Sequence, residues 1–312
     1  MSTSPPSPPI LVTGCHRSGT TWLASLLVAS PGIAYIDEVF NLDHRIPGAC
    51  AARFPHWYMH LTEESGREYV RPLGRTLGFH FDWADAARTL RAPRRLRRAP
   101  ASAARFRAAR RRRLRPLLKD PLAFFSAEWL AETFPMQVVV MVRHPGAFAA
   151  SLKRLDWRFD FHEFLDQPAL MRDHLAPYRA EIEAFAAQPP PIVDQAGLVW
   201  RCVYGTAARL REVHPEWQFV RHEDLSLRPR EELEPVCNRL RIPFDDAIAA
   251  RIAETTAAAN PTDAPQGRAH QLRRNSAANV DAWRSRLDAD EVARLRATVG
   301  DELGAFYDDA SW

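Results

Sequence analysis

A short apolar run, a glycine-bearing loop and a helix-forming stretch follow one another near the start of the chain. Ile10–Val12 is typical of a buried strand, and residues 20–29 carry apolar side chains at helical spacing. The loop glycines, Gly14 and Gly19, let the backbone approach an anion closely and leave its N–H groups free. The following helix directs its N-terminal N–H groups and the positive end of its dipole to the same point. This order of elements predicts an anion-binding loop in an α/β protein.

Strand and helix signals alternate along the rest of the chain. Short apolar or β-branched runs predict further strands at residues 33–36, 117–119, 136–142 and 218–221. More helices are predicted toward the end of the chain, and earlier ones over residues 121–131, 145–155 and 198–213. Residues 41–83 have no clean period, so we expect loops and short helices there. The alternation indicates a three-layer α/β/α fold with a parallel central sheet.

The length of 312 residues suits one large α/β domain. We expect residues 1–9, which are rich in serine and proline, to be a disordered tail, and residues 10–312 to form the single domain. No secretory signal is recognisable, and no run reaches the roughly 18 apolar residues that a membrane span needs. The four cysteines lack metal-ligand spacing, so we expect free thiols and a cytoplasmic protein.

A basic segment lies in the first half of the chain. The net charge is only +4, but thirteen arginines and no acidic residue lie between Arg88 and Arg115. We expect a helical insertion over about residues 84–116, broken near Pro93 and Pro100. Such a segment either attracts an anionic partner, such as a polyanion or a lipid surface, or is a solvated helical face.

The first loop also has the spacing of the P-loop of nucleotide-binding proteins. Gly14 and Gly19 fit the pattern GxxxxGK[ST], but Thr20 stands where that pattern has its lysine. Arg17 supplies a cation inside the loop instead, and arginine contacts phosphate and sulfate in a bidentate way. A nucleotide kinase or another P-loop NTPase therefore stays an open interpretation, although the missing lysine argues against it.

The same stretch resembles a more specific motif. Arg17–Trp22 reads RSGTTW and is similar to the 5′-phosphosulfate loop, [KR]SGTTW, of the sulfotransferases that use 3′-phosphoadenosine-5′-phosphosulfate (PAPS). The resemblance implies a P-loop NTPase-like sulfotransferase fold with PAPS as the sulfuryl donor. It implies that the donor is bound by Arg17, Ser18, Gly19, Thr20, Thr21 and Trp22. Trp22 is implied to stack on the adenine, although a core-facing aromatic side chain fits the helix equally well.

A second motif follows the strongest strand signal. Arg143 lies at the carboxyl end of the predicted strand 136–142, where open α/β sheets bind ligands, and Ser151 lies about two turns into the next helix. The segment from Arg143 to Ser151 resembles the 3′-phosphate motif of the same family, R-[DNH]-P-x-x-x-x-x-S. Both residues are therefore implied to hold the 3′-phosphate beside the first loop.

Three weaker similarities continue the resemblance. Lys119, in the segment LKDP, corresponds to a family lysine that faces the sulfuryl group. His222, in the segment RHEDL, replaces the tyrosine of the family's YEDL turn, and we expect it at the nucleotide. The segment NVDAWR, residues 279–284, resembles the C-terminal part where a basic loop closes over the nucleotide, which implicates Arg273 and Arg274.

The resemblance spans most of residues 10–300 but leaves residues 41–115 uncovered, where recognition of the acceptor is expected. The basic insertion falls in this uncovered part, directly before Lys119. We therefore expect the Arg88–Arg115 segment at the acceptor side of the cleft, where it would attract an anionic acceptor or an anionic membrane that carries one.

The resemblance implies an enzyme that moves a sulfuryl group from PAPS to a hydroxyl of a carbohydrate, a glycolipid or a natural product, as bacterial members do. In-line transfer depends on positioning and charge stabilisation, so Arg17 and Lys119 are expected to meet the charge of the leaving phosphate. Protein-tyrosine and some carbohydrate sulfotransferases use a glutamate in the loop after the first helix, and this resemblance implies that Glu38, just past a predicted strand, is the general base. The alternatives for this base are Asp37, Asp120 and His16.

Two further expectations concern partners. The family needs no metal, and no nucleic acid is expected as a partner. A non-enzymatic protein that binds polyanions or a membrane surface through Arg88–Arg115 is the remaining interpretation, but it leaves both phosphate motifs unexplained.

Overall fold

Five short strands form one parallel sheet at the centre of the computed structural model, which describes residues 7–43, 46–88, 99–262 and 272–312. All neighbouring strands of this sheet run parallel. The order across the sheet is β2 (Ile33–Asp37), β3 (Arg115–Lys119), β1 (Ile10–Gly14), β4 (Gln137–Val142) and β5 (Gln218–Arg221). The strands lie within two residues of the predicted ones, and the predicted parallel α/β architecture is confirmed.

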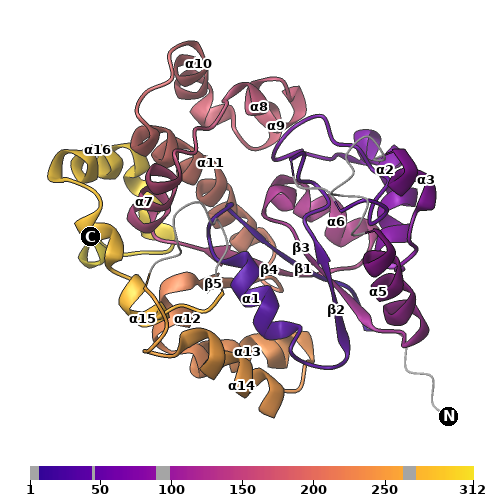
Figure 1. Ribbon diagram of the computed structural model, residues 1–312. Helices are drawn as coiled ribbons and strands as arrows, with labels where there is room; N and C mark the ends of the chain where they lie inside the picture. The colour runs from indigo at the N-terminus through magenta and orange to yellow at the C-terminus, as the bar shows by residue number, and fades with distance from the viewer. Residues whose placement is uncertain (1–6, 44–45, 89–98, 263–271) are drawn as a thin grey trace.

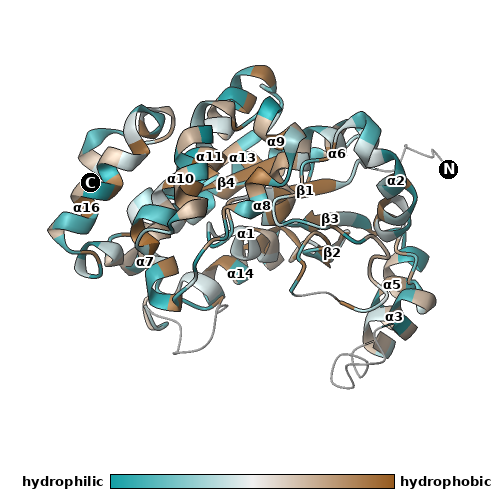
Figure 2. Ribbon diagram, turned by 90° about the horizontal axis from the view of Figure 1, so that it is seen from above, coloured by the Kyte–Doolittle hydropathy of each residue, from teal (hydrophilic) through white to brown (hydrophobic). Residues whose placement is uncertain are grey.

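Residues of each strand alternate between two hydrophobic cores, because successive side chains of a strand point to opposite faces of the sheet. Ile10 and Val12 face one core, which is completed by α1 (Thr20–Leu27), α13 (Pro229–Leu240) and α14 (Asp246–Thr256). Leu11 faces the other core, which includes side chains of α6 (Ala127–Thr133), α7 (Pro145–Leu155) and α11 (Ile192–Val213). Figure 1 shows α13 and α14 below the sheet and α11 above it, and Figure 2 shows the apolar strands between helices with polar outer surfaces.

The remaining helices surround these layers. In the first half of the chain they are α2 (Glu63–Leu77), α3 (Trp83–Arg88), α5 (Ala99–Arg111) and the 3₁₀ helix η2 (Pro121–Ser126). In the second half they are α8 (His162–Leu165), α9 (Pro168–Asp173), η3 (Ala176–Tyr178), α10 (Arg179–Ala187), α12 (His222–Leu227), α15 (Ser276–Asn279), η4 (Ala282–Ser285), α16 (Ala289–Val299), η5 (Gly300–Ala305) and η6 (Asp309–Ser311). No described helix is long and apolar enough to cross a membrane. The four cysteines are buried free thiols.

The structure differs from the sequence-based expectation in α2. This helix of 15 residues lies in the part that was expected to hold only loops and short helices. Gly66 and Pro72 interrupt its sequence pattern, yet a Cβ atom at position 66 would come within 2.2 Å of the Trp129 ring. The glycine therefore serves close packing between α2 and α6, and it hides the helical period from the sequence.

Two other boundaries differ. The stretch from Pro121 begins as the 3₁₀ helix η2 before α6 starts, whereas one α-helix was expected. α11 begins six residues earlier than expected, at Ile192. In the basic segment, Pro100 lies in the first turn of α5, where proline is tolerated, so it does not break the helix. Pro93 lies outside the described residues.

Candidate active site

A cavity of about 900 Å³ opens at the carboxyl ends of the strands. Every strand leads into it: the loop after β1, the ends of β2 and β3, and the residues that follow β4 and β5. The residues that represent the five strands there are Arg17, Asp37, Lys119, Arg143 and His222. Open parallel sheets bind ligands at the carboxyl ends of their strands, because the loops and helix N-termini converge there.

The loop between β1 and α1 is held close to its neighbours by two glycines with positive φ. Gly14 has φ 138°, and a Cβ atom there would lie 2.3 Å from the carbonyl oxygen of Met141. Gly19 has φ 100°, and a Cβ atom there would lie 2.5 Å from the His222 ring. Both positions exclude larger residues. Thr20 and Thr21 at the start of α1 line the cavity, so the N–H groups and the positive end of the dipole of α1 are directed into it and suit an anion.

Arg17 joins the two predicted phosphate motifs. Its Nε donates to Ser151 Oγ at 3.3 Å, and its carbonyl oxygen accepts from Arg143 Nη1 at 2.6 Å. Arg17 itself has φ 63°, a conformation that is uncommon outside glycine and that occurs at ligand sites. The structure thus brings together the side chains that the sequence placed in two separate motifs.

Positive charge is concentrated in this part of the cavity. Burial, followed by the charges of Arg143 and Arg274, lowers the pKa of Arg17 to about 9. Arg143 is only 8% exposed, and its Nε has no hydrogen-bond acceptor among the described residues. A buried guanidinium is costly without an acceptor, so the site fits a ligand with several negative charges.

A buried lysine lies at the end of β3, beside two carboxylates from the end of β2. Lys119 is 2% exposed, and its Nζ contacts Glu38 Oε1 and, at 2.8 Å, Asp37 Oδ1. Burial alone would lower the pKa of Lys119, but Glu38 and Asp37 outweigh it and raise the pKa. Tyr35 donates to Asp37 Oδ1 at 2.8 Å, and Asn41 Nδ2 donates to Glu38 Oε2 at 2.6 Å. Both carboxylates are thereby fixed at the cavity wall.

The loop that carries Glu38 is tied to the neighbouring strand. Glu38 has φ 22°, and its backbone N–H donates to the carbonyl oxygen of Lys119 at 2.9 Å. Asp120 accepts the N–H groups of Phe40 at 2.7 Å and Leu122 at 3.0 Å, one with each carboxylate oxygen. Asp120 is fully buried and does not line the cavity. Its carboxylate therefore holds the loop in place rather than facing a substrate.

His16 lines the cavity but is poorly suited to accept a proton. Its Nδ1 lies 2.6 Å from the hydroxyl of Tyr58, which also accepts the His16 backbone N–H at 3.0 Å. Burial, and then the charge of Arg17, lowers the pKa of His16 to about 3. A general base works best with a pKa near the working pH, which argues against His16 in that role.

Trp22 and His222 form another part of the cavity. Their ring centroids lie 5.6 Å apart, and Trp22 Nε1 donates to Thr255 Oγ1 at 3.1 Å. Trp22 belongs to the hydrophobic core and also lines the cavity, so the core-facing interpretation is confirmed and the contact with the adenine stays a prediction. Burial, and then Arg143 and Arg274, lowers the pKa of His222 well below its usual value, so the ring is neutral at pH 7.

Of the two arginines expected in the C-terminal basic loop, only one lines the cavity. Arg274, Ser276 and Asn279 line the cavity. Arg273 does not line it; its Nε donates to Glu254 at 2.9 Å. The expected role of Arg273 at the nucleotide therefore has no support in this geometry. Trp283 of the same C-terminal segment is also outside the cavity and packs on the His144 ring with centroids 5.0 Å apart.

The opposite wall of the cavity was not expected from the sequence. Trp57, Trp157 and Phe159 supply aromatic surface there, together with Leu122 and Leu152. Their segments have no local motif, and only the tertiary fold brings them together. Trp157 lies 5.7 Å from the Arg17 guanidinium, which is a cation–π distance.

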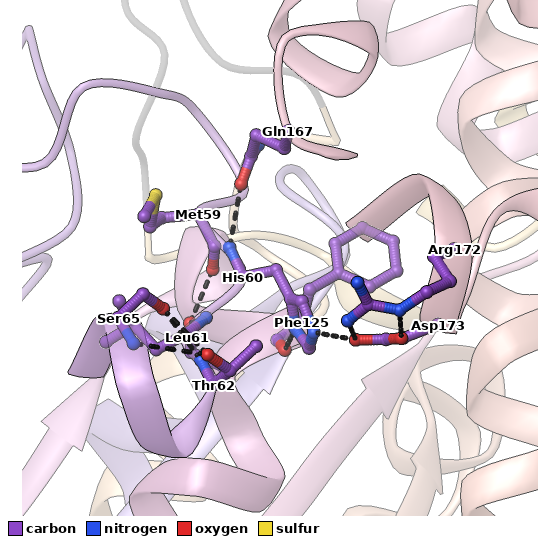
Figure 3. A network of polar contacts seen from close by, with 10 residues as sticks. Met59, His60, Leu61, Thr62, Ser65, Phe125, Gln167, Arg172 and Asp173 are labelled. Atoms are coloured by element: carbon purple, nitrogen blue, oxygen red, sulfur yellow. Dashed lines mark hydrogen bonds and ion pairs between the residues drawn. The ribbon is translucent and has the colours of Figure 1, made fainter. Parts of the chain in front are cut away.

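The segment that carries Trp57 is anchored by a polar network (Figure 3). The backbone N–H of Trp57 donates to Glu163 at 2.8 Å, and that of His60 donates to Gln167 at 2.9 Å. The His60 ring lies between the carbonyl oxygen of Phe125, at 2.7 Å from Nδ1, and Asp173, at 3.0 Å from Nε2. These contacts fix the aromatic wall against η2, α8 and α9.

The basic segment does not form this wall. None of the described residues of 83–88 or 99–115 lines the cavity. Arg111 ends α5 only four residues before β3 starts, so this end of α5 is at the amino ends of the strands, opposite the cavity. Figure 1 shows α2, α3 and α5 together beside β2 and β3. The described residues of this segment therefore give no support to its expected place at the acceptor side, which stays a prediction.

Comparisons with known proteins bear on the chain as a whole. A family model described as the sulfotransferase family matches residues 8–246. No curated protein sequence matches significantly. Similar solved structures include the sulfotransferase domain of the Synechococcus PCC 7002 olefin synthase, with 17% identity over 96% of this chain and 98% of that one and a TM-score of 0.46. Sulfotransferase STF9 of Mycobacterium avium has 17% identity over 97% and 78%, with a TM-score of 0.46. Mouse sulfotransferase SULT7A1, solved with PAP, has 14% identity over 98% and 86%, with a TM-score of 0.48.

Proposed function

Because the chain belongs to the sulfotransferase family, we propose that it transfers a sulfuryl group from PAPS to a hydroxyl of a carbohydrate, a glycolipid or a natural product. The observation that carries this proposal is the junction at Arg17, where both phosphate motifs meet inside one cavity. Family membership supports sulfuryl transfer in general, and the identities of the donor and of the acceptor class are our proposal.

The cavity residues fit the parts of PAPS. The glycine loop and Arg17 would hold the 5′-phosphosulfate, and Arg143 with Ser151 would hold the 3′-phosphate. Trp22 would contact the adenine, with His222 behind it and Arg274 closing the site from the C-terminal loop. When bound, PAPS supplies a sulfuryl group on a phosphate leaving group, so the protein's task is positioning and charge stabilisation.

The two carboxylates and the lysine support the transfer. Glu38 accepts the proton of the acceptor hydroxyl, and Asn41 and Lys119 orient its carboxylate for this step. Lys119 and Arg17 face the cavity as cations and stabilise negative charge that develops on the leaving side. Asp37 holds Lys119 in place through the Tyr35 hydrogen bond.

The aromatic wall bears on the acceptor. Trp57 and Trp157 line the same cavity as Glu38, and their faces suit the apolar face of a sugar ring or the flat body of a natural product. A hydroxyl on such a body is a reasonable partner for Glu38, whereas no described arginine of α5 lines the cavity.

Two alternatives explain less. A P-loop kinase or NTPase needs a lysine at the position of Thr20. A non-enzymatic polyanion- or membrane-binding protein leaves unexplained why a buried lysine pairs with two carboxylates beside a cation-rich cavity.

The assignment of Arg143 is tested with two adenine nucleotides, of which only the first carries a 3′-phosphate. Arg143→Ala should weaken binding of PAP, the product of PAPS, by about 1.5–3 kcal/mol, the range for a lost hydrogen bond to a charged group. Binding of adenosine 5′-phosphosulfate, which lacks the 3′-phosphate, should change little. Competition titrations with both nucleotides measure this, and Arg143→Lys should give an intermediate loss. If Arg143→Ala keeps the wild-type preference for the 3′-phosphate, the assignment is wrong.

A further inference from the structure

A second cavity, of about 570 Å³, lies between the C-terminal end of α2 and one face of α5. It is lined by four arginines, Arg75 from α2 and Arg107, Arg110 and Arg111 from α5. The three arginines of α5 share one helix face, because positions three and four apart lie together on a helix. This cavity shares no lining residue with the active-site cavity.

The charge of this second cavity is not compensated by the part of the protein that the structure describes. No acidic residue is among the described residues that line it. Some other arginines of the chain have partners: Arg228 contacts Asp224 and Glu232, and Arg201 contacts Glu181. Within the described chain, the four cavity arginines form no ion pair, so their guanidinium groups are available to an anion.

Aromatic side chains form the base of the cavity. Phe79 is 5% exposed and packs edge-on against Phe106 with ring centroids 5.7 Å apart. Phe81 lies 4.8 Å from Trp83, whose side chain is 58% exposed at the rim. Phe79 has φ 53°, which is a genuine outlier for a bulky residue, and the next residue's N–H bonds back to the carbonyl oxygen of Arg75. The chain therefore holds a strained turn that places aromatic rings beside the arginines.

The positive charges of α2 and α5 also act on His80, which lines the same cavity. Burial, and then the charges of Arg110 and Arg75, lowers the pKa of His80. The ring thus feels cations from both helices, one from α5 and one from α2. An anion bound between these helices would relieve that repulsion.

We propose that this second cavity is a binding site for a ligand with clustered phosphate or sulfate groups. Guanidinium groups bind such groups through paired hydrogen bonds, and the aromatic base excludes water from one side of them. The site is distinct from that of the proposed sulfuryl transfer, because the two cavities share no lining residue. The ligand is either a free polyanion or the headgroup of an anionic lipid, and these sources are separated by experiment.

The test compares two triple variants of equal charge in the full-length protein. Arg107→Gln/Arg110→Gln/Arg111→Gln removes the α5 arginines of the cavity. Arg105→Gln/Arg112→Gln/Arg113→Gln removes three exposed arginines of the same segment that do not line it. The first arm titrates inorganic tripolyphosphate at about 0.15 M salt, where long-range attraction is screened beyond roughly 8 Å. The second arm measures co-sedimentation with phosphatidylglycerol vesicles against phosphatidylcholine vesicles.

The affinity of the cavity variant should be at least tenfold lower than that of wild type in at least one arm. A tenfold loss corresponds to one lost charge-assisted interaction. The control variant should stay within about threefold of wild type. Loss in the tripolyphosphate arm assigns a free polyanion, and loss in the vesicle arm alone assigns a lipid headgroup. The proposal is overturned if wild type binds neither probe, or if both variants lose binding equally. Because the active-site cavity is also rich in cations, both triple variants are measured in the Arg143→Ala background as well, and the loss assigned to the second cavity is the one that persists there. A failure of the nucleotide assignment is seen separately, in the PAP titration.

Discussion

Glu38→Gln should lower turnover by roughly 10²–10⁴-fold, the usual contribution of a general base, while PAP affinity stays near that of wild type. The substitution keeps the shape and the Asn41 contact but removes the capacity to accept a proton. Steady-state kinetics with PAPS and a working acceptor measure the first quantity, and a PAP titration measures the second.

The matched control for this variant is Asp37→Asn. Asp37 lines the same cavity and contacts the same lysine, but we assign it to positioning. It should lower turnover by less than about tenfold, since a positioning contact contributes less than the base. A larger loss in Asp37→Asn than in Glu38→Gln would transfer the role of base to Asp37. Near-normal turnover in both variants would remove this carboxylate pair from the reaction.

Lys119→Met should destabilise the protein by about 1.5–3 kcal/mol, the range for a lost hydrogen bond to a charged group, because Asp37 and Glu38 are 31% and 15% exposed. Lys119 is almost fully buried, and its loss leaves Asp37 and Glu38 side by side without a cation. Turnover should also fall, because Glu38 loses the contact that orients it. Urea unfolding monitored by fluorescence gives the change in the free energy of unfolding.

Lys153→Met is the control for this stability effect. Lys153 contacts Glu291 at 2.7 Å, but its side chain is 42% exposed, so its loss should cost no more than about 1 kcal/mol. Lys119→Met/Asp37→Asn should recover part of the stability lost in the single variant, because one stranded charge is removed. Equal destabilisation by Lys119→Met and Lys153→Met would contradict the assignment of a buried lysine to the site.

The central sheet was predictable because each of its strands is encoded by a short stretch of neighbouring residues. Each strand is a short apolar run, and the glycine loop after β1 carries its own signal in sequence and in backbone conformation. The same holds for Arg143, which follows the strongest strand and therefore had to lie at the ligand-binding edge of a parallel sheet.

The aromatic wall and the extent of α2 were not predictable in this way. Trp57 and Trp157 are 100 residues apart in the chain, and only packing places them in one cavity. The glycines and proline of α2 oppose helix formation by propensity, and contacts with Trp129 override that preference. Arg273 and Arg274 are neighbours of equal charge, so their different partners are set by the tertiary structure alone.

The basic segment illustrates a further limit of sequence. Its position before Lys119 suggested proximity to the sulfuryl group, but a parallel strand separates its described end from that lysine. β3 spans Arg115–Lys119, which at about 3.3 Å per residue places its two ends at opposite edges of the sheet. Neighbours in sequence across a strand are therefore not neighbours at a site.

The central claim is that this cavity binds the PAPS nucleotide, and a thermal unfolding experiment with PAP tests it most directly. At about 100 times its dissociation constant, a ligand that binds only the folded protein stabilises it by about 2.7 kcal/mol, which raises Tm by several degrees. The account predicts this rise with PAP, a smaller rise for the Arg143→Ala variant at the same concentration, and little change with ATP and Mg²⁺. No shift with PAP, or an equal or larger shift with ATP and Mg²⁺, would contradict it.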